Sequence, residues 1–324
     1  MARRLSRREL MRLAALGAAS TPLTRLAGAG SRPGSGVIGL AKLAPPAGGG
    51  AVSAALAREA LAAALKATTG AASARDALAS LFKPSDVVGV KLNCLSGRNL
   101  SPRRELVEAL VALLGEAGVT PERVIAFDRS SRELQRAGFS IRRDGEGYRC
   151  YGIDNDYEAQ PSNSGAIGSC FARLVASTCT ALIGFGVVKD HDLSGVSASL
   201  KNWYGVIHNP NKYHDGNCNP YAADVFNHPY LRDQVRLTVL DGVVAQCHGG
   251  PAYRPDSSFP LGLVVASTDP VAVDAWAWKV IDAERRRRGL PTLAEAGRPP
   301  RFLATAARYG LGVGDPAAVR EVLG

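Results

Sequence analysis

Short apolar runs alternate with helical segments along most of the chain, and this alternation limits the fold more than any other feature of the sequence. The runs have the length of ordinary strands, and their continuous apolar character is typical of strands covered on both faces. This pattern predicts an α/β fold with a mainly parallel sheet and helices on both faces. The expected strands are residues 86–92, 123–128, 181–188, 235–240 and 261–266, and the expected helices are residues 54–66, 74–82, 102–117, 131–137, 170–178 and 271–283.

Local signals refine this pattern at a few places. Ser101 and Pro102 have the order of a cap and a first helical residue, so we expect the helix over residues 102–117 to begin there. Residues 143–168 and 207–222 are polar and rich in glycine and asparagine. We expect both stretches to be long surface loops, which in a single large domain often carry function.

The first thirty residues have the composition of a signal peptide. Residues 6–12 read Ser-Arg-Arg-Glu-Leu-Met-Arg, an apolar stretch follows at residues 13–19, and residues 27–29 fit an A-x-A cleavage site. A basic start, a short apolar centre and a small-residue end form a leader that is too short to span a membrane. The paired arginines indicate the twin-arginine translocase as export partner, and therefore a periplasmic or other extracytoplasmic location. The alternative is an arbitrary basic N-terminal helix.

The rest of the chain divides into a tether and a domain. Residues 31–50 are rich in proline, glycine and serine and are expected to form a flexible tether, and residues 51–324 suffice for one large α/β domain. No apolar run in this domain is long enough to cross a bilayer. Cargo of the twin-arginine route folds before export, often around a metal or an organic cofactor. We therefore expect a bound cofactor, a metal ion or metal-containing group being one option, whose identity the sequence does not specify.

The formal net charge of +10 does not by itself indicate a nucleic-acid partner, because of where the charges lie in the chain. The first thirty residues contain six arginines and one glutamate, so they carry +5 of this charge. Part of the remainder lies in the run Arg285–Arg288, which is expected to be a solvated helix face. No aromatic residues are interleaved with this run, as a stacking site would require. The composition does not indicate a nucleic-acid partner.

Polar side chains directly follow each expected strand. In a parallel sheet the carboxyl ends of the strands meet at one edge, and ligands bind in the crevice outside that edge. The alternative is ordinary turn and capping chemistry, which favours Asp and Asn at the same places. Lysine is a poor cap, so Lys91 and Lys189 favour the site interpretation. The residues that follow the strands are Lys91 and Asn93, Asp128 and Arg129, Lys189 to Asp192, Asp241, and Asp269.

The histidines form a second pattern, because all five lie between residues 191 and 248. Histidine is the commonest metal ligand and the usual general base near neutral pH. The spacing matches no standard zinc motif, and none of the six cysteines forms a C-x-x-C pair. Two interpretations remain open, a mixed metal site or separate hydrogen-bonded histidines. The candidate metal ligands are His191, Asp192, His214, Cys218 and His248.

A third segment, residues 195–205, resembles the start of a helix that could hold an anion. Small residues open it, Ser197 offers a hydroxyl, and Lys201 lies about one turn further on. Free N–H groups at a helix N-terminus attract anions. The segment is not a Walker loop, and the chain contains no G-x-S-x-G nucleophile elbow. The familiar nucleotide-binding and acyl-transfer sites are therefore not indicated.

The chain contains, in this order, the motifs Val88 to Asn93, Lys189-x-His191, Leu200 to Gly205, Asp241-Gly242, Gly250-Pro251 and Asp269 to Asp274. Together these motifs resemble the domain-of-unknown-function 362 family of bacteria and archaea. Members often have twin-arginine leaders, and some have ferredoxin-type iron–sulfur modules, which the scattered cysteines of this chain exclude here. The chain departs from the family at Gln246-Cys247-His248-Gly249, where an acidic residue and glycines are usual. The resemblance covers about residues 85–280 and supports the α/β fold and the choice of site residues without supplying a reaction.

These patterns together favour an exported, metal- or cofactor-dependent enzyme that acts on a small anionic molecule. The alternatives are a non-catalytic periplasmic binding protein for an anion or a metal, and an assembly factor for exported redox enzymes. The residues expected to be catalytic are His191, Lys189, Lys201 and Asp241. The residues expected to bind the ligand are Lys91, Asn93, Asp128, Asn202 and Ser197.

Overall fold

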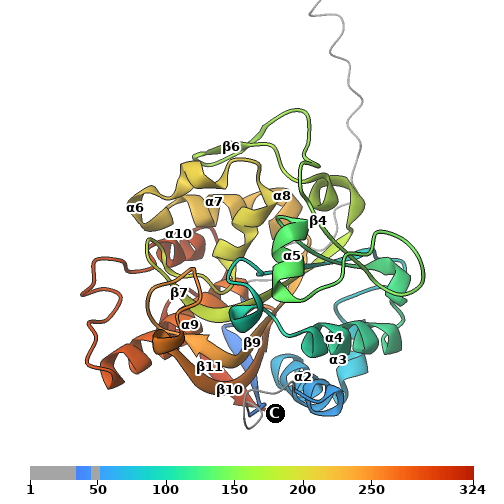
Figure 1. Ribbon diagram of the computed structural model, residues 1–324, viewed down its shortest axis with the longest axis horizontal. Helices are drawn as coiled ribbons and strands as arrows, with labels where there is room; N and C mark the ends of the chain where they lie inside the picture. The colour runs from blue at the N-terminus through green and yellow to red at the C-terminus, as the bar shows by residue number, and fades with distance from the viewer. Residues whose placement is uncertain (1–33, 45–51) are drawn as a thin grey trace, which may run out of the picture. The chain divides into compact units, whose positions relative to one another are not determined.

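The computed structural model describes residues 34–44 and 52–324, which form one α/β domain. The proposed leader and its cleavage site lie outside these residues. Apart from a separate two-stranded ribbon, the strands form one nine-stranded, mostly parallel sheet, as the alternation of apolar runs predicts (Figure 1). Within the described part of the chain no helix is both long and apolar enough to cross a membrane.

The sheet has the order β11-β1-β10-β9-β7-β2-β3-β4, and β8 pairs with β7 beside this path. The neighbours from β9 to β4 run parallel, whereas β10 runs antiparallel to both β9 and β1. The carboxyl ends of β2, β3 and β7 therefore lie at one edge, and the carboxyl end of β10 lies at the other. The strands are β1 Val37–Lys42, β2 Val88–Leu92, β3 Val124–Asp128, β4 Arg149–Gly152, β7 Ala181–His191, β8 Gly195–Val196, β9 Val235–Gln246, β10 Ser258–Ser267 and β11 Arg320–Leu323, with a ribbon of β5 Ser162–Ser164 and β6 Ile167–Ser169.

The prediction of a flexible tether over residues 31–50 is wrong for its central part. Val37–Lys42 forms strand β1, whose first five residues are buried. This strand pairs with β10 on one side and β11 on the other, and its partner residues in both strands lie more than two hundred positions later in the chain. The surrounding prolines and glycines obscure a short apolar run, Val-Ile-Gly-Leu-Ala, that the sheet requires.

Helices cover both faces of the sheet, as predicted. Figure 1 shows α2, α3 and α4 together on one side, while α7, α9 and α10 belong to the hydrophobic clusters of the other side. The expected helix at 170–178 is reduced to the π-helical turn Leu174–Thr178. The α-helices are α2 Ala54–Thr69, α3 Ala74–Ala79, α4 Arg104–Glu116, α5 Ser131–Ala137, α6 Asp215–Cys218, α7 Tyr221–Asn227, α8 Pro229–Arg232, α9 Pro270–Arg287 and α10 Phe302–Arg308.

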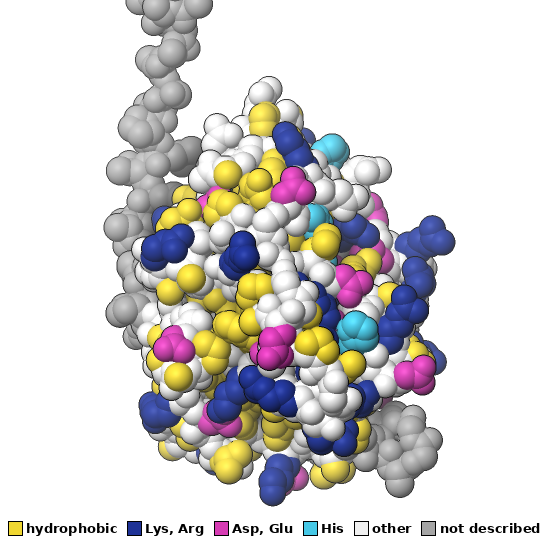
Figure 2. All heavy atoms as spheres, turned by 90° about the vertical axis from the view of Figure 1, so that its left-hand side faces the viewer, with side chains coloured by type: hydrophobic (Ala, Val, Ile, Leu, Met, Phe, Trp, Pro, Cys, Tyr) yellow, Lys and Arg dark blue, Asp and Glu magenta, His cyan; other side chains and the backbone are white. Residues whose placement is uncertain are grey.

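Two local predictions about helices are corrected by the structure. Helix α4 begins at Arg104 rather than at Pro102, and Ser101 donates its hydroxyl to the carbonyl of Gly97 instead of capping the helix. In the arginine run, Arg285 is buried and donates to the carbonyls of Cys247 and Pro291. Only the rest of the run is on the surface. On the face shown in Figure 2, basic side chains stand in separate groups with acidic and apolar side chains between them.

One close approach between strand and loop prepares the site. A Cβ at Gly186 in β7 would lie 2.1 Å from the carbonyl oxygen of Ala198, which is far inside van der Waals contact. Only glycine therefore allows the segment around Ala198 to pack directly against β7. This contact places the following 3₁₀ helix, η5 Leu200–Val206, over the carboxyl edge of the sheet.

Candidate functional site

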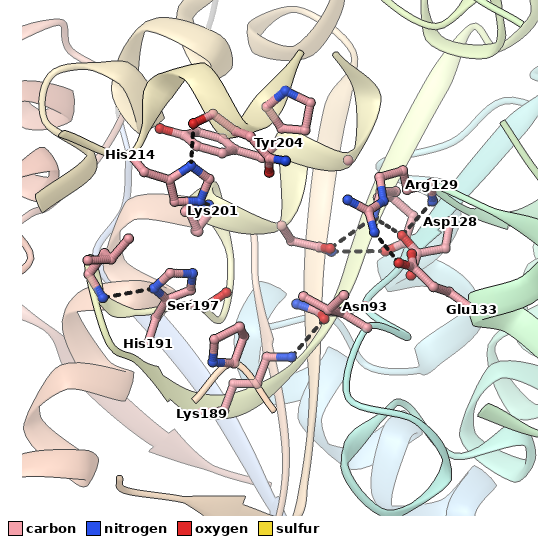
Figure 3. Close-up of a pocket in the computed structure, with 18 residues that line it drawn as sticks. Asn93, Asp128, Arg129, Glu133, Lys189, His191, Ser197, Lys201, Tyr204 and His214 are labelled. Carbon is pink, nitrogen blue, oxygen red and sulfur yellow. Dashed lines mark hydrogen bonds and ion pairs between the residues drawn. The ribbon is translucent and has the colours of Figure 1, made fainter. Parts of the chain in front are cut away.

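A pocket of about 330 Å³ lies at the carboxyl ends of β2, β3 and β7, under η5 (Figure 3). This is the edge at which the sequence predicts a crevice, and the pocket contains every residue expected to bind the ligand. It is lined by Lys91, Asn93, Leu95, Asp128, Arg129, Glu133, Lys189, His191, Leu193, Ser197, Lys201, Asn202, Tyr204, Gly205, Pro210, Asn211, His214 and Pro251.

Lys91 forms a buried ion pair with Asp128. Its Nζ donates to Asp128 Oδ1 at 2.6 Å, to Asn202 Oδ1 at 3.0 Å and to the carbonyl of Leu92 at 2.7 Å. Asp128 also accepts the backbone N–H of Cys94 at 2.6 Å. Asn202 donates back to the carbonyl of Lys91 at 3.2 Å. All donor positions of the Lys91 ammonium are thus used inside the protein, so its role is to hold β2, β3 and η5 together at the floor of the pocket.

Lys189 is also buried, but its hydrogen-bond partners are neutral. Its Nζ donates to Asn93 Oδ1 at 2.9 Å and to Ser96 Oγ at 2.7 Å, and Ser96 in turn donates to the carbonyl of Pro251. Burial lowers the pKa of Lys189 to about 8. Figure 3 shows the ammonium pointing toward Asn93 at the base of the pocket. An anionic ligand placed here would restore the charge balance that burial disturbs.

Lys201 lies on the opposite wall, on η5, and contacts an aromatic ring and a histidine. Its Nζ is 3.6 Å from the centre of the Tyr204 ring and 3.1 Å from His214 Nε2. Burial lowers the pKa of Lys201 to about 8. His214 Nδ1 lies 3.4 Å from the carbonyl of Asn211, which can only accept, so we place the proton on Nδ1. His214 Nε2 then has a free lone pair that accepts from Lys201, and the two groups can exchange a proton.

His191 is fixed in the opposite tautomer. Its Nδ1 accepts the backbone N–H groups of Leu193, at 3.1 Å, and Ser194, at 3.4 Å. Its proton is therefore on Nε2, and burial lowers its pKa to about 2, so the ring stays neutral at physiological pH. A neutral ring with this tautomer can donate a hydrogen bond to an anion. It is poorly suited to bind a metal through Nε2, because metal-binding histidines normally donate their other N–H.

The anion site predicted at the start of residues 195–205 is already filled by the chain itself. The backbone N–H groups of Ala198, Ser199 and Leu200 donate to the carboxylate of Asp274 at 3.1, 2.8 and 2.8 Å. Asp274 is fully buried in α9, and this burial raises its pKa to about 6. Ser197 still lines the pocket, but the three amides that lead into η5 already donate to Asp274 and are not available to a ligand.

Two of the predicted edge residues lie away from the pocket. Asp241 is in the middle of β9 rather than after it, because the strand continues to Gln246, and its carboxylate pairs with Arg103 at 2.6 Å. A catalytic role for Asp241 at this pocket is therefore not supported. Asp269 follows the antiparallel strand β10, so it lies at the opposite edge. There it caps α9 by accepting the N–H groups of Val271 and Ala272.

The proposed metal ligands do not converge. Only His191 and His214 line the pocket, with ring centres 5.9 Å apart. The side chain of Asp192 is mostly exposed, and Cys218 contacts the carbonyl of His214. His248 Nδ1 lies between two arginines outside the pocket. Across residues 34–44 and 52–324 no group of three histidine, cysteine or acidic residues is arranged to hold a metal ion.

A buried arginine that the sequence patterns did not single out supports the site. Arg298 donates to Asp190 Oδ2 at 2.9 Å and to the carbonyl of His191 at 2.9 Å, and so holds the end of β7. Asp190 also accepts the backbone N–H of Gly250 at 3.0 Å. No signal near Arg298 in the sequence marks this role, because Asp190 and His191 lie more than one hundred residues away. Arg129 and Glu133 form an ion pair at the pocket wall. In the sequence, Arg129 is recognisable only as an arginine that follows a strand, and Glu133 only as a carboxylate four residues later.

Comparisons with known proteins give a family and no activity. No curated protein matches the chain. A solved structure of a protein from Thermotoga maritima, a structural genomics target, aligns at 10% identity with a TM-score of 0.40. The alignment covers 79% of this chain and 59% of that protein, so the chain spans less than two thirds of its length. Residues 88–279, which are more than half of the chain and carry most of the pocket, match the family described as a domain of unknown function, DUF362, and the protein belongs to that family.

Proposed function

We propose that this protein is an enzyme that binds a small anionic molecule between Lys189 and Lys201 and moves a proton with the pair Lys201–His214. The observation that carries the proposal is the charge of the pocket. Lys91 and Arg129 are matched by Asp128 and Glu133. Lys189 and Lys201 have no carboxylate within ion-pair distance anywhere in the described ranges.

The lysines and the histidines have different roles in this proposal. Lys189, and His191 through its Nε2–H, hold the anionic group of the ligand, while Asn93 fixes the Lys189 ammonium. Lys201 has a pKa of about 8, so both its ammonium and its amine are populated near neutral pH, as a general acid or base requires. His214 Nε2 then receives or returns the proton at 3.1 Å.

The proposal also concerns the kind of group that the pocket binds, including a metal or organic cofactor, and the location of the protein. The donor set of the pocket is rich in ammonium groups and poor in carboxylates, which suits an anionic ligand better than a bare cation. We infer periplasmic location from the paired arginines Arg7 and Arg8. Fractionation of cells that express the full chain checks this inference, and protein confined to the cytoplasm contradicts it.

Replacing Lys189 by methionine is the direct test of the anion site. Methionine keeps the length and apolar stem of the side chain but removes the charge. We expect phosphate and small carboxylates to bind the wild-type protein and to bind the Lys189→Met variant about ten- to a hundredfold more weakly, because a charge-assisted hydrogen bond is lost. Isothermal titration calorimetry measures the affinities, and circular dichroism checks that the variant is folded.

The exposed Lys66 on α2 provides the matched control, since Lys66→Met removes the same charge far from the pocket. Unchanged affinity in Lys189→Met, or an equal loss in Lys66→Met, contradicts the proposal. The pH dependence is a second check within the same titrations. With the carboxylates, which stay ionised throughout this range, binding should weaken above about pH 8, where Lys189 and Lys201 lose their protons. It should show no transition near pH 6.5, because burial lowers the pKa values of His191 and His214.

A further inference from the structure

The mouth of the pocket has an apolar rim formed by Leu95 and Leu193. We propose that the ligand is an anion with an apolar portion, and that these two leucines contact that portion. This inference rests on the proposed anion site and adds the chemical class of the molecule that enters it. Leu95 is 44% exposed and Leu193 is 49% exposed, and both line the pocket. They come from two separate loops, the one after β2 and the one after β7.

Leu193 is held in place although its side chain is exposed. Its backbone N–H donates to His191 Nδ1, and its carbonyl accepts from Asn217 Nδ2 at 3.0 Å. The hydrogen bond that fixes the tautomer of His191 therefore also fixes the position of this leucine. A residue needed only as a loop connector at this place could be polar, since 49% of its surface is exposed.

Leu95 is held in the same way in the loop after β2. The N–H of the preceding Cys94 donates to Asp128, and the following Ser96 accepts from Lys189 and donates to the carbonyl of Pro251. The residues on both sides of Leu95 are thus bound to groups of the anion site. The two leucines have fixed positions relative to the ammonium group that would bind the anionic end.

An apolar portion of a ligand gives these exposed side chains a partner. Covering apolar surface releases about 25 cal/mol per Å², so a ligand group of phenyl size at the rim should add substantially to the affinity. The volume of about 330 Å³ suits a small molecule rather than a protein segment. The charged side chains of Lys189 and Lys201 line the same pocket. A small amphiphilic acid fits both observations, with its anionic end at Lys189 and its apolar end between the leucines.

The experiment uses matched probes that share an anionic group and differ in apolar size. The pairs are propionate with 3-phenylpropionate, and methylphosphonate with phenylphosphonate, titrated calorimetrically into the full chain. We expect the phenyl member of a pair to bind about tenfold more tightly. In the double variant Leu95→Ser/Leu193→Ser the preference should fall to about threefold or less, while the affinity for propionate and methylphosphonate stays the same.

Leu56, which is 54% exposed on α2 away from this pocket, supplies the control variant Leu56→Ser, in which the preference should persist. If the two members of each pair bind with equal affinity, or if the double variant keeps the preference for the phenyl member, the apolar rim has no role. The proposed anion site is not affected by either result. If no probe binds, or if Lys189→Met leaves the binding of all four unchanged, the proposed function itself fails and this inference fails with it.

Discussion

Replacing Asp128 by asparagine is expected to lower the free energy of unfolding by about 3–5 kcal/mol, because it leaves a buried ammonium without its counter-charge. Asp128 accepts from Lys91 at 2.6 Å, from Cys94 N at 2.6 Å and from Arg129 N at 2.7 Å. Asparagine offers one oxygen for these three donors, and its amide would face at least one of them donor to donor. Urea denaturation followed by circular dichroism measures the change.

A surface ion pair of the same kind gives the scale for this effect. Arg58 and Glu116 lie 2.6 Å apart, with side chains 44% and 46% exposed. The variant Glu116→Gln should cost less than about 1 kcal/mol, because solvent screens exposed charges. Adding Lys91→Met to Asp128→Asn should recover part of the loss, since the unpaired charge is then removed as well. A cost for Asp128→Asn that is no larger than that of Glu116→Gln would show that Lys91 does not depend on Asp128.

Replacing Lys201 by methionine is expected to slow proton transfer on the bound ligand by about 10²- to 10⁴-fold, which is the usual contribution of a general acid or base. Exchange of the C–H protons next to the keto group for deuterium in D₂O, followed by NMR on a panel of small 2-oxo acids, measures this transfer on molecules that need not be the natural substrate. Methionine keeps the length and the apolar stem of this buried side chain beside the Tyr204 ring, so the fold should persist.

The two lysines should separate in this assay. Lys189→Met should weaken binding but retain exchange at saturating probe, because Lys189 holds the ligand and Lys201 moves the proton. If probes bind to the wild-type protein but none exchanges, the non-catalytic binding protein becomes the better description. Equal exchange rates in Lys201→Met and the wild-type protein at saturation would remove Lys201 from the chemistry and leave the anion site in place.

The alternation of apolar runs predicted the α/β class and most of the central strands, because buried parallel strands leave a signal that is local in the sequence. The apolar run of β1 was obscured by the prolines and glycines around it, and nothing local to it indicates its pairing with β10, which joins residues more than two hundred positions apart. Asp241 was misread as the residue after a strand. A charged residue inside β9 is tolerated only because Arg103, from a distant segment, neutralises it.

Three residues that line the pocket, Lys91, Lys189 and Lys201, could be singled out from the sequence because lysine is unusual at strand ends and in a buried turn. The contacts that support the pocket were not predictable. Asp274 reaches Leu200 from 74 positions away, and Arg298 reaches Asp190 from 108 positions away. The metal hypothesis gained no support for a similar reason. Histidines that are close in the sequence need not face the same cavity, and the sequence does not determine which ring nitrogen points into it.

The carboxylate of Asp274 has a consequence for how the pocket meets its ligand. By accepting hydrogen bonds from the three amides that precede Lys201, it fixes the backbone of this turn before any ligand arrives. A ligand therefore does not have to order the segment that carries Lys201, and the conformational entropy of that ordering is already lost on folding. Binding should show little change in backbone hydrogen exchange around η5, as expected for a rigid receptor whose selectivity is set in advance by its shape and charge.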